Sequence, residues 1–365
     1  MIKTLALLGV LALSGPLAAQ PADPSTLAKV LAGAKMGGTI ALAPGSYGDV
    51  PIYNSRTPNL LTLTCADPAR PPVLRSLTIN NSANVVVTCL QIAFTPDAKT
   101  VTWSSAVTID GSQDVTLRGV RISGAPAITG ALPDAAVGAS TGNVIGWPTA
   151  RGVSVQNAAR VRIEGGEISG FHRGIFFHLV EVATLTGVDI HDLRATAIVG
   201  ANVRDLTIQG NTLRDAHPWR WGETPLGDHA DFIALWADSG QTQPNGRVKI
   251  LDNLVVQDPK LPAVLGLWFQ GGDLARFTDF EISRNRMFLN NLQAIALWNA
   301  GPGLISGNSL LRNGPVEKQA PAILLRSGVT GVAVSGNTLS QISDQSGGVN
   351  PQSGNIIVSG MVTRP

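Results

Sequence analysis

The sequence is poor in charge, in aromatic rings and in cysteine. Of its 365 residues, 14% are charged and 5% aromatic, and only two are cysteine. Ordinary soluble domains carry about 25% charged residues. The formal net charge is +2 and no block of Lys or Arg occurs, so we expect no nucleic-acid partner. The hydrophobic share of 44% excludes a disordered chain.

Long apolar runs are also missing, except for a short one at the N-terminus. Met1 to Gln20 is typical of a signal peptide: Lys3 is followed by a mostly apolar run, Thr4 to Leu13, and then by small residues. A buried first helix is the alternative. No segment reaches the roughly 18 apolar residues of a membrane span. We therefore expect a cleaved signal peptide, a periplasmic or secreted protein without a membrane span, and a monomer.

Several motifs of common catalytic and metal sites are absent. The chain has no His/Cys zinc spacing, no phosphate-binding loop and no nucleophile elbow. His172, His178 and His191 are spread along the chain without a ligand spacing. The residues themselves therefore predict no metal site.

A short phrase recurs through the chain and predicts its fold. Ile208-Gln209-Gly210-Asn211-Thr212-Leu213 has further copies centred on Asn308 and Asn337, and looser ones on Asn253 and Asn285. Short β segments repeating at about 22 residues or more indicate a solenoid. Parallel strands joined by crossovers are right-handed. We expect a single all-β domain, residues 21–365, folded as a right-handed parallel β-helix, with the Asn side chains stacked as a ladder.

The two cysteines occur in similar settings, Leu63-Thr64-Cys65 and Val87-Thr88-Cys89. Equivalent positions on neighbouring coils lie about 4.8 Å apart, which is within the Cα range of a disulfide. Export permits the bond. Two stacked thiols without a bond are the alternative.

The first residues after the signal segment suggest a cap and a family. Ser25 to Lys35 has the pattern of a short amphipathic helix that covers the open end of the solenoid, with Ser25 as its N-cap. The following segment, GGTIALAPGSY (residues 37–47), resembles the start of pectin-lyase-like β-helix proteins. It is most similar to the alginate- and chondroitin-cleaving lyases of polysaccharide lyase family six. The resemblance implies a polysaccharide substrate, a Lys base, an Arg acid and a calcium cofactor.

Aligning the strands predicts which side chains share a face. One inward column runs Val107, Val153, Ile175, Ile198, Ile233, Leu267, Ile295, Ile323. Three residues further on, an outward column runs Asp110, Gln156, His178, Ala201, Trp236, Gln270, Trp298, Arg326. A column at the strand starts runs Arg151, Arg173, Thr196, Asp231, Leu265, Gln293. Rings, His, Asp and Arg on one face indicate a working surface, and the longest insertions, residues 125–150 and 216–230, precede strands of this face.

The segment Asp228-His229-Ala230-Asp231 carries the best chemical candidates. A His acts as a base near neutral pH, and a flanking carboxylate orients it or raises its pKa. Arg173 and Arg151 share the strand-start column with Asp231 and are expected to neutralise a uronate carboxylate. We predict Asp228, His229, Asp231 and Arg173 as catalytic. Turn-capping by the two Asp residues, with His229 on the surface, is the alternative.

Substrate binding is assigned to rings and polar groups on the same face. Trp rings stack on sugars. The predicted binding residues are Trp219, Arg220, Trp221, Trp236, His178, Gln270, Trp298 and Arg151. For Trp268 and Trp298 a role in covering the solenoid is equally well supported.

Three functions remain open at this point. The first is a lyase or C5 epimerase acting on an acidic, uronate-containing polysaccharide. The working columns lack the Lys of family six, and the Asp-Pro-His-Asp motif of β-helical epimerases has its His one place later than in this chain. The second is a glycoside hydrolase that pairs Asp231 with Asp228, Asp110 or Asp238. The third is a non-catalytic glycan-binding or envelope protein.

Overall fold

The computed structural model describes residues 19–34, 37–96, 100–101, 103–124, 150–218, 228–242, 245–314 and 320–358. The expected signal segment lies outside these residues up to residue 18, and Gln20 already belongs to a strand. Among the described residues, no helix is long and apolar enough to cross a membrane.

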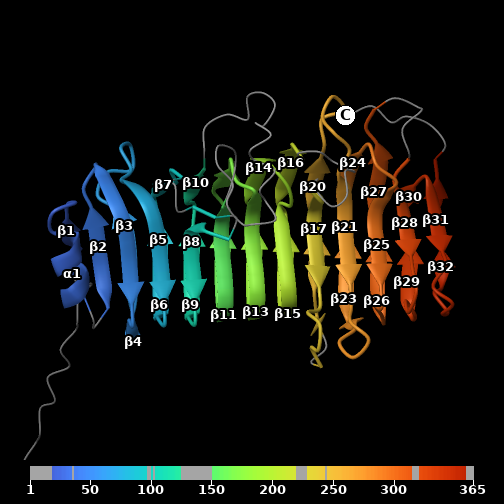
Figure 1. The fold of residues 1–365 in the computed structure, drawn as a ribbon, viewed down its shortest axis with the longest axis horizontal. Coiled ribbons are helices and arrows are strands. Elements are labelled where there is room, and N and C mark those ends of the chain that lie inside the picture. Colours follow the sequence, from blue (N-terminus) through green and yellow to red (C-terminus); the bar gives the residue numbers. More distant parts are fainter. Residues whose placement is uncertain are drawn as a thin grey trace, which may run out of the picture.

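The chain is a right-handed parallel β-helix, as predicted, and successive coils stack along its long axis (Figure 1). Three parallel sheets form its sides. The first sheet carries the predicted working face. Its strands are β3 (Ser46–Tyr53), β5 (Val73–Asn80), β8 (Ser105–Asp110), the first parts of β11 (Arg151–Glu164), β13 (Arg173–Thr186) and β15 (Ile198–Gln209), then β17 (Asp231–Trp236), β21 (Leu265–Gln270), β25 (Gln293–Trp298), β28 (Ala322–Leu325) and β31 (Gln341–Asp344).

The second sheet adjoins the first through the long strands β11, β13 and β15, whose later parts belong to it. Its other strands are β1 (Gln20–Ala22), β2 (Gly38–Leu42), β4 (Arg56–Cys65), β6 (Ala83–Thr88), β9 (Gln113–Arg118), β18 (Asn245–Gly246), β19 (Lys249–Leu251), β22 (Phe277–Thr278), β23 (Phe280–Ser283), β26 (Gly303–Ser306), β29 (Val332–Ser335) and β32 (Gln352–Ser353).

The third sheet closes each coil. It contains β7 (Gln91–Ala93), β10 (Arg121–Ser123), β12 (Glu167–Ser169), β14 (Asp189–Leu193), β16 (Thr212–Ala216), β20 (Leu254–Val256), β24 (Arg286–Leu289), β27 (Ser309–Arg312), β30 (Thr338–Leu339) and β33 (Ile356–Ile357).

The predicted strand alignment is confirmed by the register of the first sheet. Val153 pairs with Val107 and Ile175, and the same column continues to Ile323 with every member buried. These side chains form one layer of a single apolar core that fills the solenoid. Because a slip of one residue would exchange the two faces of a strand, the outward positions of the face are fixed as well.

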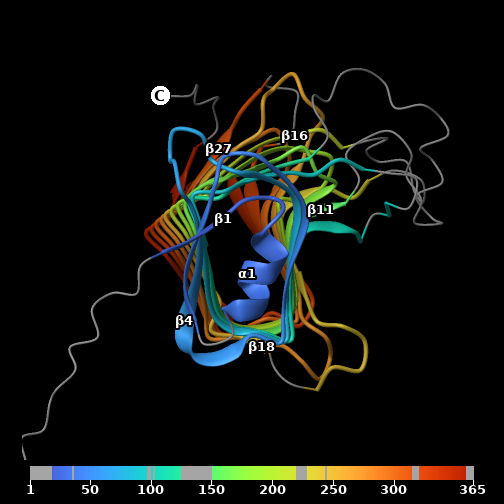
Figure 2. The same cartoon turned by 90° about the vertical axis from the view of Figure 1, so that its left-hand side faces the viewer.

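A short helix, α1 (Leu27–Gly33), covers the first coil, as Figure 2 shows. Leu27 is buried in the core, and Val30 and Leu31 pack against it. The helix begins later than Ser25, and its N-cap is Thr26 without a side-chain cap bond. Asp23 instead accepts hydrogen bonds from the backbone N–H groups of Ser25 and Thr26, both at 2.9 Å. That carboxylate orders the turn, which is why Ser25 is not the cap.

The predicted Asn ladder is confirmed at the corner between the second and third sheets. Asn211 Nδ2 donates to Asn253 Oδ1 at 2.9 Å, and Asn253 donates in the same way to Asn285. The ladder continues through Asn308 and Asn337 to Asn355. The same oxygens also accept backbone N–H groups, as Asn285 Oδ1 does from Asn253 at 3.0 Å. Each rung therefore ties one coil to the next.

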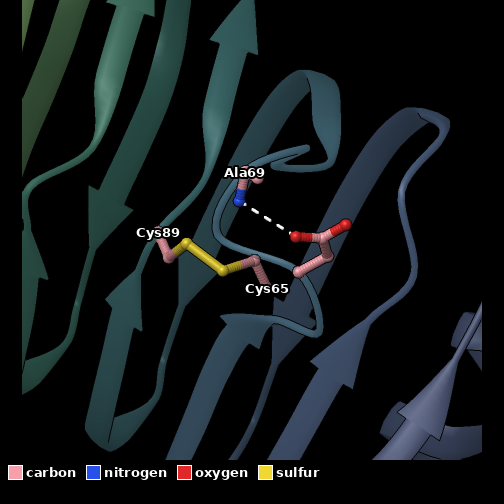
Figure 3. The surroundings of a disulfide bond; sticks show 4 residues. Cys65, Ala69 and Cys89 are labelled. Carbon is pink, nitrogen blue, oxygen red and sulfur yellow. Dashed lines mark hydrogen bonds between the residues drawn. A yellow bond between two sulfur atoms is a disulfide. The ribbon is translucent and has the colours of Figure 1, made fainter.

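Cys65 and Cys89 are joined by a disulfide, with their Cα atoms 5.4 Å apart (Figure 3). Cys65 ends β4 and Cys89 follows β6, and Leu63 pairs with Val87 two residues before them. The bond therefore links equivalent positions on neighbouring coils. Of the two alternatives drawn from the sequence, this is the one present in the structure.

Candidate functional site

The strand starts of the first sheet bring distant basic and acidic residues to one corner of the solenoid. Arg151 begins β11 and pairs in register with Arg173, the first residue of β13. Asp231 begins β17, two coils further on, and pairs with Leu265. Neighbouring coils of a parallel sheet lie about 4.8 Å apart. The predicted strand-start column is therefore real, and it sets charged side chains beside one another.

Arg151 and Arg173 are cations without an ion-pair partner among the described residues. The guanidinium of Arg151 lies over the ring of Phe176, 3.9 Å from its centroid. The Nε atoms of both arginines are buried and make no hydrogen bond to the described chain. Burial, reinforced by the charge of Arg173, lowers the pKa of Arg151 to about 10. Burial also lowers the pKa of Arg173, although the charges of Asp228 and Asp231 oppose this. With a pKa of about 10, Arg151 remains cationic at neutral pH, and a guanidinium is in general protonated in proteins.

Asp228 is held by a buried arginine that the sequence analysis missed. Arg194, whose side chain is 1% exposed, donates two hydrogen bonds to Asp228, from Nε at 2.8 Å and from Nη2 at 3.0 Å. His172 Nε2 lies 3.6 Å from the other side of that carboxylate, at Oδ1. Burial disfavours the charge of Asp228, but the nearby His172 and the hydrogen bonds from Arg194 outweigh it and lower the pKa of the carboxyl. Asp228 is thus an ionised anchor for the segment leading into β17.

His172 is kept neutral in this cluster. Burial lowers its pKa to about 4; the nearby carboxylate of Asp228 opposes the shift, and the charges of Arg173 and Arg194 add to it. Its Nδ1 is buried with no hydrogen-bond partner among the described residues. A neutral imidazole is the form that accommodates two neighbouring guanidinium groups.

His229 and Asp231 form a hydrogen-bonded pair at the corner. His229 Nδ1 lies 3.0 Å from Asp231 Oδ2. The imidazole is 66% exposed, whereas Asp231 is 2% exposed. The hydrogen bond to Asp231 raises the pKa of His229 above its ordinary value, and burial opposes this. Burial raises the pKa of Asp231, and the bond to His229 opposes that. With Asp231 ionised, Nδ1 is the donor, so Nε2 carries the lone pair.

Three tryptophans continue the face toward the C-terminus. The ring of Trp268 lies 6.0 Å from that of His229, 6.5 Å from Trp236 and 6.2 Å from Trp298. Trp236 and Trp298 occupy the predicted outward column, with the exposed Gln270 between them in register. Trp268 and Trp298 also pack on Ala296, Ala322 and Leu324, so these two rings cover the sheet as well.

Asp238 organises the far end of the same strands. Its carboxylate accepts from Trp236 Nε1 at 3.1 Å and from Asn202 Nδ2 at 2.6 Å, and it lies 3.0 Å from His178 Nε2. The ring of His178 stacks with Phe176, with centroids 6.0 Å apart. His178 and Trp236 are therefore fixed in place by one acidic residue. Since Phe176 also underlies Arg151, the two ends of the face are connected.

The structure separates some of the predicted partners. Asp238 follows the end of β17 while Asp231 begins it, so the two residues are seven positions apart, roughly 23 Å of extended chain. Asp110 ends β8 and accepts hydrogen bonds from the side chains of Asn80 and Asn157. Neither Asp238 nor Asp110 flanks Asp231. Trp219, Arg220 and Trp221 lie outside the described residues.

The two additional residues of the site carry weak signals in the sequence. Arg194 stands alone in Asp192-Leu193-Arg194-Ala195-Thr196, outside every aligned column, and only burial beside Asp228 reveals its role. His172 precedes the strand-start column by one residue. Lys249 lies in β19 on the second sheet, and Lys260 lies in an exposed loop before β21.

The donor set of the corner does not fit calcium. Calcium takes about 6–8 oxygen ligands, largely from carboxylates. Both oxygens of Asp228 accept from Arg194, and one oxygen of Asp231 is engaged by His229. In the part of the chain that the structure describes, no group of three or more His, Cys, Asp or Glu side chains could hold a metal ion. The corner presents the guanidinium groups of arginines, whereas a calcium ion would need carboxylates.

Comparison with known proteins supports the fold. No family model matches the chain, and no curated protein matches it. Among solved structures, the chain is similar to the surface adhesin PfbA of Streptococcus pneumoniae, with a TM-score of 0.51 and 13% identity over 92% of this chain and 87% of that one. For DFA-IIIase of Arthrobacter chlorophenolicus A6, without its lid, the TM-score is 0.46 and the identity 10%, over 94% of this chain and 92% of that one. For an alginate lyase of Paenibacillus sp. str. FPU-7, the TM-score is 0.38 and the identity 13%, over 92% of this chain and 98% of that one.

Proposed function

We propose that this protein is an exported enzyme that acts on an acidic, uronate-containing polysaccharide by removing the C5 proton, in β-elimination or in C5 epimerisation. The observation that carries the proposal is the His229–Asp231 pair, 3.0 Å apart, at the same corner as Arg151 and Arg173, two cations without an ion-pair partner among the described residues. Residues 1–20 serve as its signal peptide. Proton removal beside a carboxylate needs a base and a positive charge, and this corner supplies both.

His229 is the base. Asp231 accepts the Nδ1 proton and fixes the ring, so that Nε2 takes the proton from C5. The positive charge of Arg173 stabilises the negative charge that spreads onto the substrate carboxylate as this proton leaves. In elimination, the C5–H electron pair forms the C4=C5 bond, the C4–O bond breaks, and the leaving oxygen takes up a proton. In epimerisation, C5 receives a proton on its opposite face.

The aromatic face holds the sugar chain beside the reacting residue. Trp236, Trp268 and Trp298 lie on successive coils, with neighbouring rings 6.2–6.5 Å apart. Sugar rings present apolar C–H faces that stack on such rings, while Gln270 and His178 offer hydrogen bonds to hydroxyls. Trp219, Arg220 and Trp221, in the segment before β17, are proposed to bind the same sugar chain.

The paired-carboxylate mechanism of a hydrolase receives less support from this site. It requires two carboxyl groups on either side of one bond, one of them free to act as an acid. Asp228 is ionised and committed to Arg194, and Asp231 is committed to His229. Asp110 and Asp238 do not flank Asp231. A hydrolase would therefore have to use a residue outside this cluster.

The test is digestion of alginate, polygalacturonate and chondroitin by the purified protein, followed by the ultraviolet absorbance of the C4=C5 bond and by NMR of C5 inversion. We expect one substrate to react and His229→Gln to abolish the reaction. His191→Gln is the matched control, because that ring is bound to Asp192 and Glu167 on the third sheet. Reducing ends without unsaturation would establish hydrolysis instead. Binding without any reaction would leave a non-catalytic glycan-binding protein.

The pH profile tests the His229–Asp231 pair directly. A base must be unprotonated, so activity should rise with pH through the pKa of His229, which Asp231 raises. Asp231→Asn removes that charge and should move the rising limb to lower pH, together with a lower maximum rate. A limb that stays in place in Asp231→Asn would show that another group is the base.

A further inference from the structure

We infer that Arg151 and Arg173 together form a metal-independent site for one free carboxylate of the substrate, in place of the calcium that the sequence resemblance implies. This inference rests on the proposed function, because it specifies how the acid group at the reacting end of the same substrate is recognised. It also restricts the substrate class to uronates whose carboxyl group is not esterified.

The first argument is uncompensated charge. Arg151 and Arg173 begin neighbouring strands in register, so their backbones are one coil spacing apart, about 4.8 Å. Neither makes an ion pair within the described chain, although exposed arginines elsewhere do, as Arg284 does with Asp252 at 2.7 Å. Two half-buried like charges side by side are unfavourable unless an anion joins them. The missing anion is supplied by a ligand.

The second argument is geometry. A guanidinium presents a planar fork that matches the two oxygens of a carboxylate. Arg151 is laid against Phe176 at 3.9 Å, which restricts its side chain and orients its plane before any ligand arrives. Two such forks on adjacent coils are suited to a planar carboxylate. Converting that carboxylate into a methyl ester removes its charge and one of its acceptor oxygens.

The third argument is the use of the local carboxylates. Asp228 is bound by Arg194 through both oxygens, and Asp231 is bound by His229. The charges of Asp228 and Asp231 act on Arg173 without forming an ion pair with it among the described residues, and they leave Arg151 unmatched. Counted over the described residues, the corner therefore keeps a net positive charge that suits an anion and repels a divalent cation.

The experiment measures binding in the inactive His229→Gln background, so that turnover does not interfere. The probes are trimannuronate, triguluronate, trigalacturonate and fully methyl-esterified trigalacturonate, titrated calorimetrically in EDTA and in excess calcium. We expect one of the three acids to bind in EDTA with no gain from calcium. Arg151→Gln and Arg173→Gln should each weaken it by about tenfold or more. Arg284→Gln, an exposed arginine on the second sheet's side, is the matched control and should bind unchanged.

Four results would overturn the inference. The first two are binding that requires calcium and, where trigalacturonate is the ligand, equal binding of its ester and acid forms. The other two are undiminished binding by both arginine variants and a failure of all three acids to bind. If Arg151→Gln does not fold, Arg151→Lys keeps the charge without the fork and should still bind more weakly. Turnover by the unmodified protein separates the two proposals. Turnover that depends on calcium removes this inference alone, whereas arginine-dependent binding without turnover of any acid removes the proposed enzyme and retains the carboxylate site.

Discussion

Two corners of the same solenoid bury polar side chains in opposite ways. At the corner between the second and third sheets, each interior Asn of the ladder donates to a backbone carbonyl and to the next Asn, as Asn285 does to Ile250 and Asn308. At the corner where the first sheet begins, Arg151, His172, Arg173 and Asp231 each keep a buried atom without a hydrogen-bond partner among the described residues. One corner is saturated and the other is incomplete.

The difference separates a structural role from a functional one. Buried polar groups in folded proteins are almost always hydrogen-bonded, so several exceptions in one place require a reason. A ladder that satisfies every rung stabilises the stacking of coils. At the other corner the described residues leave cations and an imidazole nitrogen unsatisfied, and we propose that a ligand completes the cluster. The contrast can be tested by breaking each corner in turn.

The largest effect is expected from the saturated corner. Asn285→Ala would leave Asn253 without its acceptor and the Ile250 carbonyl without its donor, all within a buried region. Each buried polar group left unsatisfied costs about 1–3 kcal/mol. We expect a loss of about 3–5 kcal/mol in the free energy of unfolding, measured from urea denaturation.

Asn355→Ala is the matched control for that change. Asn355 is the last described rung, and it is less buried than Asn285. Water can replace its bonds, so its loss should cost well under half as much. Equal losses at the two positions would show that the ladder does not derive its stability from burial.

The second effect is a pH dependence of stability that arises at the incomplete corner. Burial lowers the pKa of His172 to about 4, from an ordinary value of 6.5. Between these values the unfolded chain takes up a proton that the folded chain does not, so stability falls as pH drops from 6.5 toward 4. At about 1.4 kcal/mol per unit, the loss should be about 2–3 kcal/mol.

His172→Phe keeps a ring of similar size and cannot titrate. Its stability at neutral pH should be lower, because the contact with Asp228 is lost, but its decline between pH 6.5 and 4 should be shallower than that of the unmodified protein. His229 acts with the opposite sign, since its pKa is raised, and it contributes equally to both proteins. Parallel declines in the two proteins would rule out His172 as the source.

The two corners differ in how well they could be predicted, because they leave different patterns in the sequence. The ladder was predictable because Asn recurs at a regular place in every late coil, and a repeated residue on stacked coils must meet itself. The inward column and the strand-start column were predictable for the same reason. The ion pair between Arg194 and Asp228 could not be predicted in this way. It joins a loop residue to a residue two strands later, and neither residue belongs to an aligned column.

The roles within the site also needed the structure. The sequence places Asp228, His229 and Asp231 together, but only burial and hydrogen bonds show that Asp231 holds the imidazole while Asp228 binds Arg194. Spacing alone also left the hydrolase pairs with Asp110 and Asp238 open. The register of β8 and β17 separates them from Asp231.

The smallest effect has the opposite sign to the first and distinguishes the corners most sharply. Arg151→Met replaces a desolvated cation, which has no ion pair among the described residues, by an apolar chain of comparable length. Replacing buried charges by apolar side chains is often neutral or stabilising. The contact with Phe176 is worth about 0.5–1 kcal/mol and offsets part of the gain. We expect a rise of about 1 kcal/mol in the free energy of unfolding, measured from urea denaturation, together with loss of uronate binding. A loss of stability comparable to that of Asn285→Ala would mean that Arg151 supports the fold, and the incomplete corner would then be structural like the ladder.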